Sequence, residues 1–185
     1  MSDASARKSN WIILLIGVIA AFPVVGSYLL YLFWKPDSFV NYGELFGPVP
    51  IEQGKAPEGF EAVRGKWAFL MVDSTPCDAY CRRKLYIMRQ VRLTQGEDMT
   101  RIERVWVVDG AAPSDAHLLS DYKGTLILPA GSSGLATRLS PHGMARDHVY
   151  LIDPLGNVMM RYPRDPDPSL IKKDLKRLLK ASRVG

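Results

Sequence analysis

The chain has 185 residues, enough for one ordinary domain but not comfortably for two. Its 47% apolar and 23% charged residues are typical of a globular protein and exclude a disordered one. The net charge is +5, most of it in residues 168–183, where no aromatic residues alternate with base-reading side chains. We therefore expect no nucleic-acid partner.

The first element is an uncharged run over 11–34 that predicts a transmembrane helix. At 1.5 Å per residue the run spans roughly 36 Å, enough to cross a hydrocarbon core of about 30 Å. Trp11 opens the run and Tyr28, Tyr31 and Trp34 lie near its other end, as in the aromatic belts of membrane interfaces. A cleaved signal peptide is the alternative, but its apolar region is normally about 7–15 residues long and ends at a small-x-small site, which this run lacks. We predict an uncleaved anchor in contact with membrane lipid.

The basic residues beside this run predict its orientation. Arg7 and Lys8 precede the helix, whereas only Lys35 is basic in the segment just after it. Loops rich in lysine and arginine stay in the cytoplasm, so residues 1–10 are predicted to be a cytoplasmic tail. The chain is then a single-pass protein of the inner (cytoplasmic) membrane, with its domain facing the periplasm.

The rest of the chain is predicted to be a tether followed by one folded domain. Prolines and glycines break any periodicity over 35–64, which predicts a tether and N-terminal extension. Strand and helix periods recur over 65–185, which predicts the domain. The predicted strands cover 66–72, 102–108, 125–128, 148–153 and 157–162, and the predicted helices cover 76–93, 113–121 and 168–181. The order β-α-β-α-β-β-α predicts an α/β fold in which helices cover a mixed sheet.

Two of the predicted helices have an apolar face that we expect to pack on the sheet. In the helix over 76–93 this face consists of Leu85, Met88, Val91 and Leu93. In the helix over 168–181 it consists of Ile171, Leu175, Leu178 and Leu179. Basic residues surround the second face, and we expect them to offer an additional contact to anionic lipid or to an acidic partner.

The only two cysteines, Cys77 and Cys81, lie where the first predicted strand gives way to the first predicted helix. A helix N-terminus stabilises thiolate over thiol, and the basic residues 82–84 add positive charge, whereas Asp78 opposes it. Four residues apart on a regular helix, the Cβ atoms would be roughly 5–6 Å apart, wider than the roughly 3.5–4.5 Å of a disulfide. The pair can still oxidise if Cys77 lies in the loop, and it equally suits two thiolates on one Cu(I) or Zn(II) ion. A redox pair, a metal site and a plain stabilising disulfide all remain open.

A histidine would be the natural third ligand, and the chain has three. His117 falls in the predicted helix over 113–121, where we expect a surface residue. His148 starts a strand expected beside the end of the strand that carries the cysteines, whereas His142 lies in a loop. We predict His148 as the third ligand with His142 in reserve, and Asp147 as a carboxylate that orients the ring.

Two stretches carry a resemblance to a known family. The segment from Gly65 to Cys81, GKWAFLMVDSTPCDAYC, resembles the GK-strand-T-x-C-x-x-x-C segment of Sco/SenC-type copper chaperones. YLIDPLG at 150–156 resembles the hairpin shared by these proteins and the TlpA/ResA-like thioredoxin group. With the preceding residues, it is also similar to a proteobacterial family associated with cytochrome oxidase. The resemblance spans about 65–162 and implies a thioredoxin-like mixed sheet, with flanking helices, behind one N-terminal transmembrane helix.

The chain departs from the Sco pattern at several positions. Asp78 and Arg82 stand where prolines usually follow the Sco cysteines, and the Sco histidine would fall at Ala145. Asp147 occupies the position at which oxidoreductases of this fold carry a cis-proline. The expected third ligand, His148, is therefore shifted by three residues from the family position.

The function that the resemblance implies is assistance to cytochrome c oxidase assembly, by binding copper or by controlling the thiol state of a copper site. Cys77 and Cys81 would be the catalytic pair and, with His148, the copper ligands. The implied partner is a cytochrome c oxidase subunit or another copper-site client protein. Two alternatives are a thiol–disulfide oxidoreductase that acts on partner cysteines and a non-redox assembly scaffold.

Overall fold

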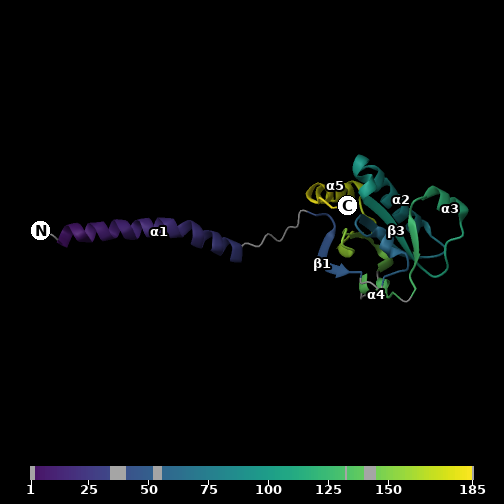
Figure 1. Cartoon of the computed structure of the whole chain (residues 1–185), viewed down its shortest axis with the longest axis horizontal. Coiled ribbons are helices and arrows are strands. Elements are labelled where there is room, and N and C mark those ends of the chain that lie inside the picture. Colours follow the sequence, from purple (N-terminus) through teal and green to yellow (C-terminus); the bar gives the residue numbers. More distant parts are fainter. Residues whose placement is uncertain (1–2, 34–40, 52–55, 132, 140–144, 185) are drawn as a thin grey trace. The chain divides into compact units, whose positions relative to one another are not determined.

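The structure, a computed structural model, describes residues 3–33, 41–51, 56–131, 133–139 and 145–184. The chain divides into two compact units, Met1–Val40 and Asn41–Gly185. Figure 1 shows the elements of both in chain order, from purple to yellow. Each unit is described by itself.

The first unit contains one long helix, α1 (Asp3–Phe33). Its window Leu15–Leu32 has a mean hydropathy of 2.1, and within the described ranges it belongs to the one helix long and apolar enough to cross a membrane. The large apolar side chains described in this helix, such as Ile16, Ile19 and Leu30, are exposed, and Pro23 lies inside the helix without ending it. Membrane helices tolerate such a proline. The apolar N-terminal helix is confirmed, whereas the cytoplasmic tail over 1–10 stays a prediction.

The second unit is built on a six-stranded mixed sheet in the order β1-β6-β5-β2-β3-β4. Strands β2, β3 and β4 are parallel, and β5, β6 and β1 join them antiparallel. The strands are β1 (Glu44–Pro50), β2 (Trp67–Ser74), β3 (Ile102–Asp109), β4 (Leu126–Pro129), β5 (Val149–Ile152) and β6 (Asn157–Arg161). β2 occupies an inner position because its residues from Trp67 to Val72 are all buried, as expected for a strand covered on both faces. The predicted mixed sheet is confirmed.

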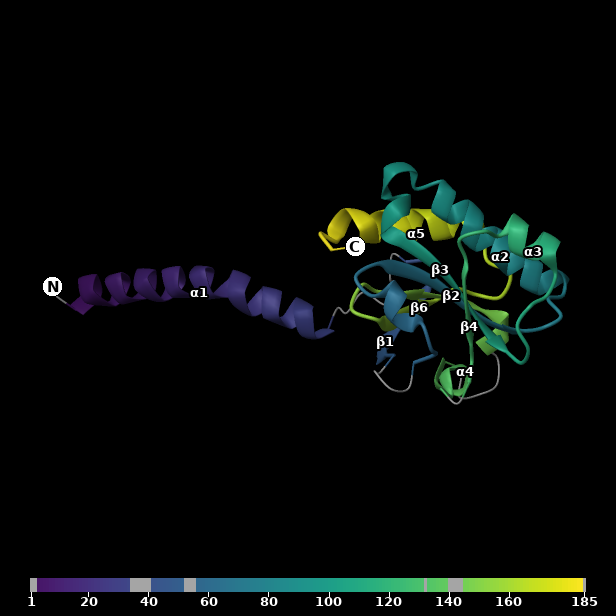
Figure 2. The same ribbon diagram turned by 45° about the vertical axis from the view of Figure 1, so that its right-hand side comes forward.

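Helices cover both faces of the sheet, as Figure 2 shows for α2 and α5 on one side and α4 on the other. The helices of this unit are α2 (Ala79–Leu93), α3 (Ala116–Asp121), α4 (Leu135–Leu139) and α5 (Pro168–Ala181), with short 3-10 turns η1 (Phe60–Val63), η2 (Gly96–Arg101) and η3 (Ala145–Asp147). Each face has its own buried cluster. Cys81 and Leu85 of α2 belong to one, and Leu135 of α4 belongs to the other.

The predicted helix faces can be compared with the buried residues. Ile171, Leu175 and Leu179 of α5 are buried, which agrees with the predicted face. Leu85, Met88 and Val91 of α2 are buried as well. Leu93 was predicted to be the fourth member of the α2 face, and this is wrong, because its side chain is 45% exposed. It is the last residue of α2.

The sheet begins earlier in the chain than predicted. The expected tether over 35–64 contains β1 and η1, and β1 pairs with β6 at the sheet's edge. The backbone N–H groups of Tyr42 and Gly43 donate to the Asp174 carboxylate at 2.8 and 2.9 Å. Asp174 lies on α5 and is buried, so this contact joins the start of the domain to its last helix. The folded unit therefore starts at Asn41 rather than at Gly65.

Candidate functional site

Cys77 and Cys81 form a disulfide at the junction between β2 and α2. β2 ends at Ser74 and α2 begins at Ala79, so Cys77 lies in the loop and Cys81 in the first helical turn. This placement brings the Cα atoms within 5.3 Å, inside the range that a disulfide requires. The two residues are not equally accessible, since Cys81 is 0% exposed and Cys77 is half-buried. Cys77 is therefore the residue that a partner can reach.

Asp78, between the two cysteines, is the N-cap of α2. Its carboxylate accepts a hydrogen bond from the backbone N–H of Cys81 at 2.8 Å. Such a cap satisfies one of the N–H groups left free at the start of a helix. The sequence analysis considered Asp78 as a charge that opposes the thiolate and as a departure from the Sco proline, and the structure adds that it holds Cys81 in the first turn.

A hollow of about 320 Å³ lies beside Cys77. It is bounded by the loop between β2 and α2 and by the loop between β3 and α3. The Thr75 hydroxyl donates to the carbonyl of Ala111 at 2.7 Å and joins these two loops. Arg82 and Asp115 are charged residues that line this hollow. The guanidinium of Arg82 donates to the carbonyl of Cys77 at 3.4 Å and pairs with the Asp115 carboxylate at 3.1 Å. The backbone N–H of Leu118, together with that of His117 and the charge of Arg82, lowers the pKa of Asp115 and keeps it ionised.

Behind the disulfide lies a buried ion pair between Lys84 of α2 and Asp73 of β2. The Lys84 ammonium is 0% exposed, lies 2.7 Å from the Asp73 carboxylate and donates to the carbonyl of Arg146. It also lies 5.2 Å from the centre of the Tyr80 ring, as in a cation–π contact. Burial lowers the pKa of Lys84, and the charge of Asp73 opposes that shift. The pair fixes α2 against the end of the strand that leads to Cys77.

Tyr80, the residue before Cys81, links α2 to two other segments. Its hydroxyl donates to the carbonyl of Asp147 at 2.8 Å and accepts from the backbone N–H of Asp165 at 3.0 Å. Burial is the main cause that raises the pKa of Tyr80, so the hydroxyl stays protonated and able to donate. The helix start that carries Cys81 is thereby tied to η3 and to the loop before α5.

The predicted third ligand, His148, lies just before β5. Nδ1 is 2.8 Å from the carbonyl of Tyr162, and the ring contacts Tyr150 edge-on at 6.2 Å between centroids. A carbonyl can only accept, so Nδ1 is the donor in this contact, and in the neutral ring Nε2 is then the nitrogen with the free lone pair. Tyr150 belongs to the buried cluster on the face opposite to Cys81. The register pairs Met71 with Val149, which sets the start of β5 beside the end of β2, and the role of His148 as a ligand stays a prediction.

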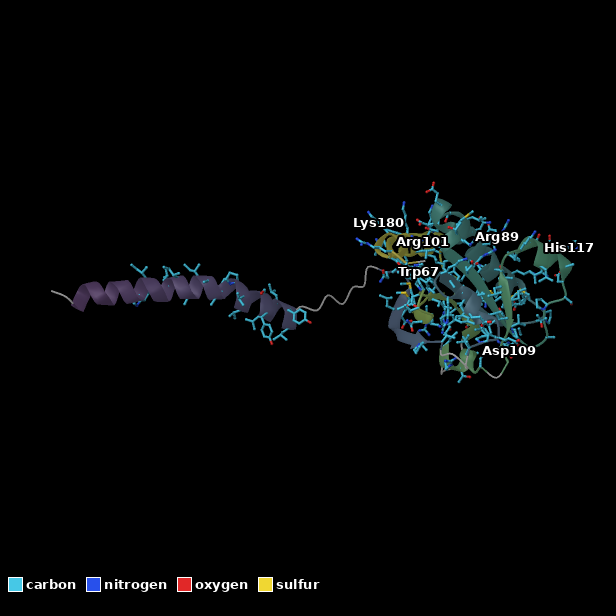
Figure 3. The ribbon with its side chains drawn as sticks, viewed as in Figure 1. Trp67, Arg89, Arg101, Asp109, His117 and Lys180 are labelled. Atoms are coloured by element: carbon cyan, nitrogen blue, oxygen red, sulfur yellow. A yellow bond between two sulfur atoms is a disulfide. The ribbon has the colours of Figure 1, made fainter. Side chains whose placement is uncertain are left out.

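The other two histidines are placed as follows. His117 of α3 is exposed at the edge of the domain, which agrees with the expected surface position (Figure 3). His142 lies outside the described residues. Within the described ranges, no group of three or more histidine, cysteine or acidic side chains is placed to hold a metal ion. The reduced cysteine pair offers two soft donors that suit copper, and the third position stays a proposal.

Lys84, Tyr80 and Asp73 are the residues of this region that sequence reasoning missed. Lys84 follows two arginines and was counted with them only as positive charge beside the cysteines. Two features of the sequence could have indicated that Lys84 is buried. Lys84 directly precedes Leu85, a member of the predicted inner face of the helix, and an acidic residue, Asp73, lies at the end of the preceding apolar strand. A buried lysine is expected only with such a partner.

Comparisons with known proteins agree with this fold. Residues 67–182 match a family model described as "Transmembrane-like, thioredoxin-like, C-terminal domain". Among solved structures, yeast Sco1 with copper bound is similar with a TM-score of 0.54 and 17% identity over 78% of this chain and 96% of that one. A SCO1/SenC family lipoprotein from Bacillus anthracis str. Ames gives 0.51 and 20% over 78% and 97%. Arabidopsis thaliana ScoI with copper bound gives 0.53 and 13% over 76% and 99%.

At identities this low the structural likenesses show the thioredoxin-like fold alone. No curated protein matches the chain.

Proposed function

Because this chain belongs to the transmembrane-like, thioredoxin-like C-terminal domain family, we propose that it is a membrane-anchored protein that acts through reversible thiol chemistry at Cys77 and Cys81. The observation that carries the proposal is the disulfide itself, with one accessible and one buried cysteine at the N-terminus of α2. A helix N-terminus stabilises the thiolate that exchange requires.

The exchange that we propose reduces a disulfide in a client. The Cys77 thiolate attacks one client sulfur, a mixed disulfide forms, and the second client sulfur leaves as a thiolate. The Cys81 thiolate then attacks Cys77, which releases the client as a dithiol and leaves the Cys77–Cys81 disulfide. One dithiol and one disulfide are consumed and one of each is formed. A second exchange, with an external protein dithiol, restores the reduced pair.

The proposed client is a copper-site protein, with a cytochrome c oxidase subunit as the first choice. The support is the resemblance of the segment from Gly65 to Cys81 to Sco-type proteins, together with the shared fold. A copper site with two cysteine ligands binds its metal only after those cysteines are reduced. Control of the client's thiols would therefore come before metal loading.

Copper binding by the reduced pair is the second candidate function, and two of the structures compared above, yeast Sco1 and Arabidopsis thaliana ScoI, contain copper. The Cys77 and Cys81 thiolates would be two ligands, and we keep His148 as the third ligand to be tested. Its Nδ1 donates to a backbone carbonyl and leaves Nε2 free, the arrangement that ligating histidines commonly have. The bound copper ion would be the cargo that the protein transfers to the client.

One experiment separates the two functions. The full chain, reduced and placed in phosphatidylcholine nanodiscs, is mixed with a client domain whose copper-site cysteines are oxidised, and alkylation with mass shift counts the thiols. We expect one client disulfide to be reduced per molecule, and Cys77→Ala to abolish the reaction. A copper arm then titrates Cu(I) into the reduced wild type, His148→Ala and His142→Ala. An unchanged client, with tight copper binding lost in His148→Ala, would replace the exchange function with the copper one.

The proposed location is the inner membrane with the domain in the periplasm. The support is the pair of basic residues before the uncharged run 11–34, Arg7 and Lys8 in the first turns of α1, against Lys35 alone just after the run. A reporter that is active only outside the cytoplasm, fused after Arg183, should be active. Activity of a cytoplasm-only reporter at the same position would contradict this orientation, and a fusion to the chain without residues 1–33 serves as the control.

A further inference from the structure

The last helix of the domain, α5, presents a basic face to the solvent. On a helix of 3.6 residues per turn, its five cations fall within a sector of about 140°. They are the exposed residues Lys172, Lys173, Lys176, Arg177 and Lys180, called the basic face below. The other side of the helix carries Ile171, Leu175 and Leu179, which are buried against the sheet. Figure 3 shows Lys180 at the outer surface of the domain.

Acidic residues offset little of this charge. Asp174 is the one acidic residue within α5, and it is 2% exposed because its carboxylate accepts the backbone N–H groups of Tyr42 and Gly43. Arg177 lies 4.0 Å from the same carboxylate. In the part of the chain that the structure describes, the four lysines of the basic face have no carboxylate within ion-pair distance. Their positive charge therefore remains available to an anionic surface.

Contacts at both ends of α5 hold the basic face in place. At the N-terminus, the carboxylate of Asp167 caps the helix and accepts from the backbone N–H of Ser169 at 2.8 Å. At the C-terminus, the guanidinium of Arg101 donates to the carbonyls of Leu179 and Ser182 at 3.2 and 2.9 Å. With its apolar side buried as well, the helix cannot turn its lysines inward. The basic face is therefore a preformed surface.

The chain between α1 and the domain is short. Whatever path residues 34–40 take, the eight peptide steps from Phe33 to Asn41 span at most about 29 Å. The next two residues, Tyr42 and Gly43, are bonded to Asp174 in the middle of α5, a helix of 14 residues and about 21 Å. The lysines of the basic face can therefore reach a membrane that α1 crosses. A tether this short keeps their local concentration in the millimolar range, so a weak attraction is sufficient.

The chemistry of the basic face suits lipid headgroups. The lysine ammonium is a point charge without a fixed hydrogen-bonding geometry, which suits a fluid layer of phosphate groups. No aromatic side chain lies in α5 to stack on a nucleotide base, and no apolar side chain lies between the cations to enter the hydrocarbon. An acidic protein would have to be recruited to this face, whereas headgroups surround an anchored α1 at all times.

We propose that the basic face of α5 docks on anionic phospholipid headgroups of the membrane in which α1 anchors the chain. Anionic headgroups favour the docked state by about fivefold for each lysine near the surface, and four lysines act together. The proposal rests on the membrane anchor of the proposed function and is independent of its thiol chemistry. Docking gives the folded domain one preferred face toward the bilayer.

The test compares lysine reactivity in two membranes. The full chain is placed in nanodiscs of phosphatidylcholine alone or of phosphatidylcholine with an equal part of phosphatidylglycerol. Reductive methylation with formaldehyde, a neutral reagent, is followed at each lysine by mass spectrometry. We expect the four lysines of α5 to react at least about fivefold more slowly in the anionic discs, and the exposed Lys123 to react equally in both. In about 1 M salt, where the Debye length is roughly 3 Å, the difference should vanish.

A charge variant tests the role of the basic face itself. Lys176→Gln with Lys180→Gln should lower the docking equilibrium about 25-fold and return the rates at Lys172 and Lys173 toward those in neutral discs. The matched control, Arg64→Gln with Lys123→Gln, removes two exposed cations outside α5 and should leave the protection of all four lysines unchanged. Far-UV circular dichroism verifies that both variants fold.

Equal rates in the two discs, or a difference that persists at high salt, would overturn the proposal. Protection of the same lysines by poly-glutamate in phosphatidylcholine discs, without an effect of phosphatidylglycerol, would overturn it in favour of an acidic protein partner. A chain that does not co-elute with nanodiscs would overturn the anchor and this proposal together, whereas a co-eluting chain with unprotected lysines would overturn this proposal alone. Because the readout is lysine reactivity, a failure of thiol exchange leaves the result unaffected.

Discussion

Replacement of Lys84 by methionine should lower the free energy of unfolding by about 3–5 kcal/mol, the usual cost when one partner of a buried ion pair is removed. The Lys84 side chain is 0% exposed and that of Asp73 is 14% exposed, so water replaces the lost ammonium at the carboxylate only in part. The carbonyl of Arg146 loses its donor in the same variant. Urea unfolding of the full chain, followed by far-UV circular dichroism, measures the change.

The double variant Asp73→Asn with Lys84→Met provides the control. With both charges gone, no uncompensated ion remains, and the pair of changes should cost clearly less than the sum of the two single ones. Lys173→Met, an exposed lysine of α5, should change the stability by no more than about 0.5 kcal/mol. Additive costs in the double variant would show that the two groups do not act as a pair.

Replacement of one cysteine at a time should separate two thiols of very different reactivity. In Cys81→Ala the remaining Cys77 thiol is accessible and should form a mixed disulfide quickly with an aromatic disulfide reagent. In Cys77→Ala the remaining Cys81 thiol is 0% exposed and must wait for a local opening. An opening that costs about 2.8 kcal/mol slows the reaction on the order of 100-fold. The absorbance of the released thiolate gives both rates.

Each variant serves as its own reference in denaturant, where burial no longer distinguishes the two residues. In concentrated urea the two thiols should react at similar rates, and the ratio of native to unfolded rates then reports burial alone. Alanine is chosen at position 81 because a serine would bring an unpartnered hydroxyl into the core. Equal native rates for the two variants would contradict the assignment of Cys77 as the attacking residue.

The parts of the fold that the sequence predicts are those with a strong local pattern. The unbroken apolar run of β2 requires cover on both faces, and the four-residue spacing of Ile171, Leu175 and Leu179 allows only one buried side of α5. Strand β1 was missed because it contains Pro48 and Pro50, which weaken the strand pattern. An edge strand tolerates prolines, since one side of its backbone needs no partner.

The candidate site likewise has residues that local sequence predicts and residues that it does not. Cys77 and Cys81 stand out through their residue type and their place between a strand and a helix, so local sequence suffices. The direction of the His148 ring depends on the carbonyl of Tyr162, fourteen residues further along the chain. The burial of Lys84 depends on the carbonyl of Arg146, 62 residues away. Such contacts follow from tertiary packing, which no spacing within one segment reveals.

The contact between the start of the domain and Asp174 has a consequence for biosynthesis. Asp174 follows Tyr42 by 132 residues, and β6, the only strand to which β1 pairs in the described sheet, also comes late in the chain. At about 5–20 residues per second, a ribosome needs roughly 7–26 s to supply these partners. Throughout that interval the segment next to the anchor has emerged but has nothing to dock on. The strand nearest the membrane anchor is therefore among the last to join the sheet, and a nascent chain that stops before α5 leaves it without its carboxylate.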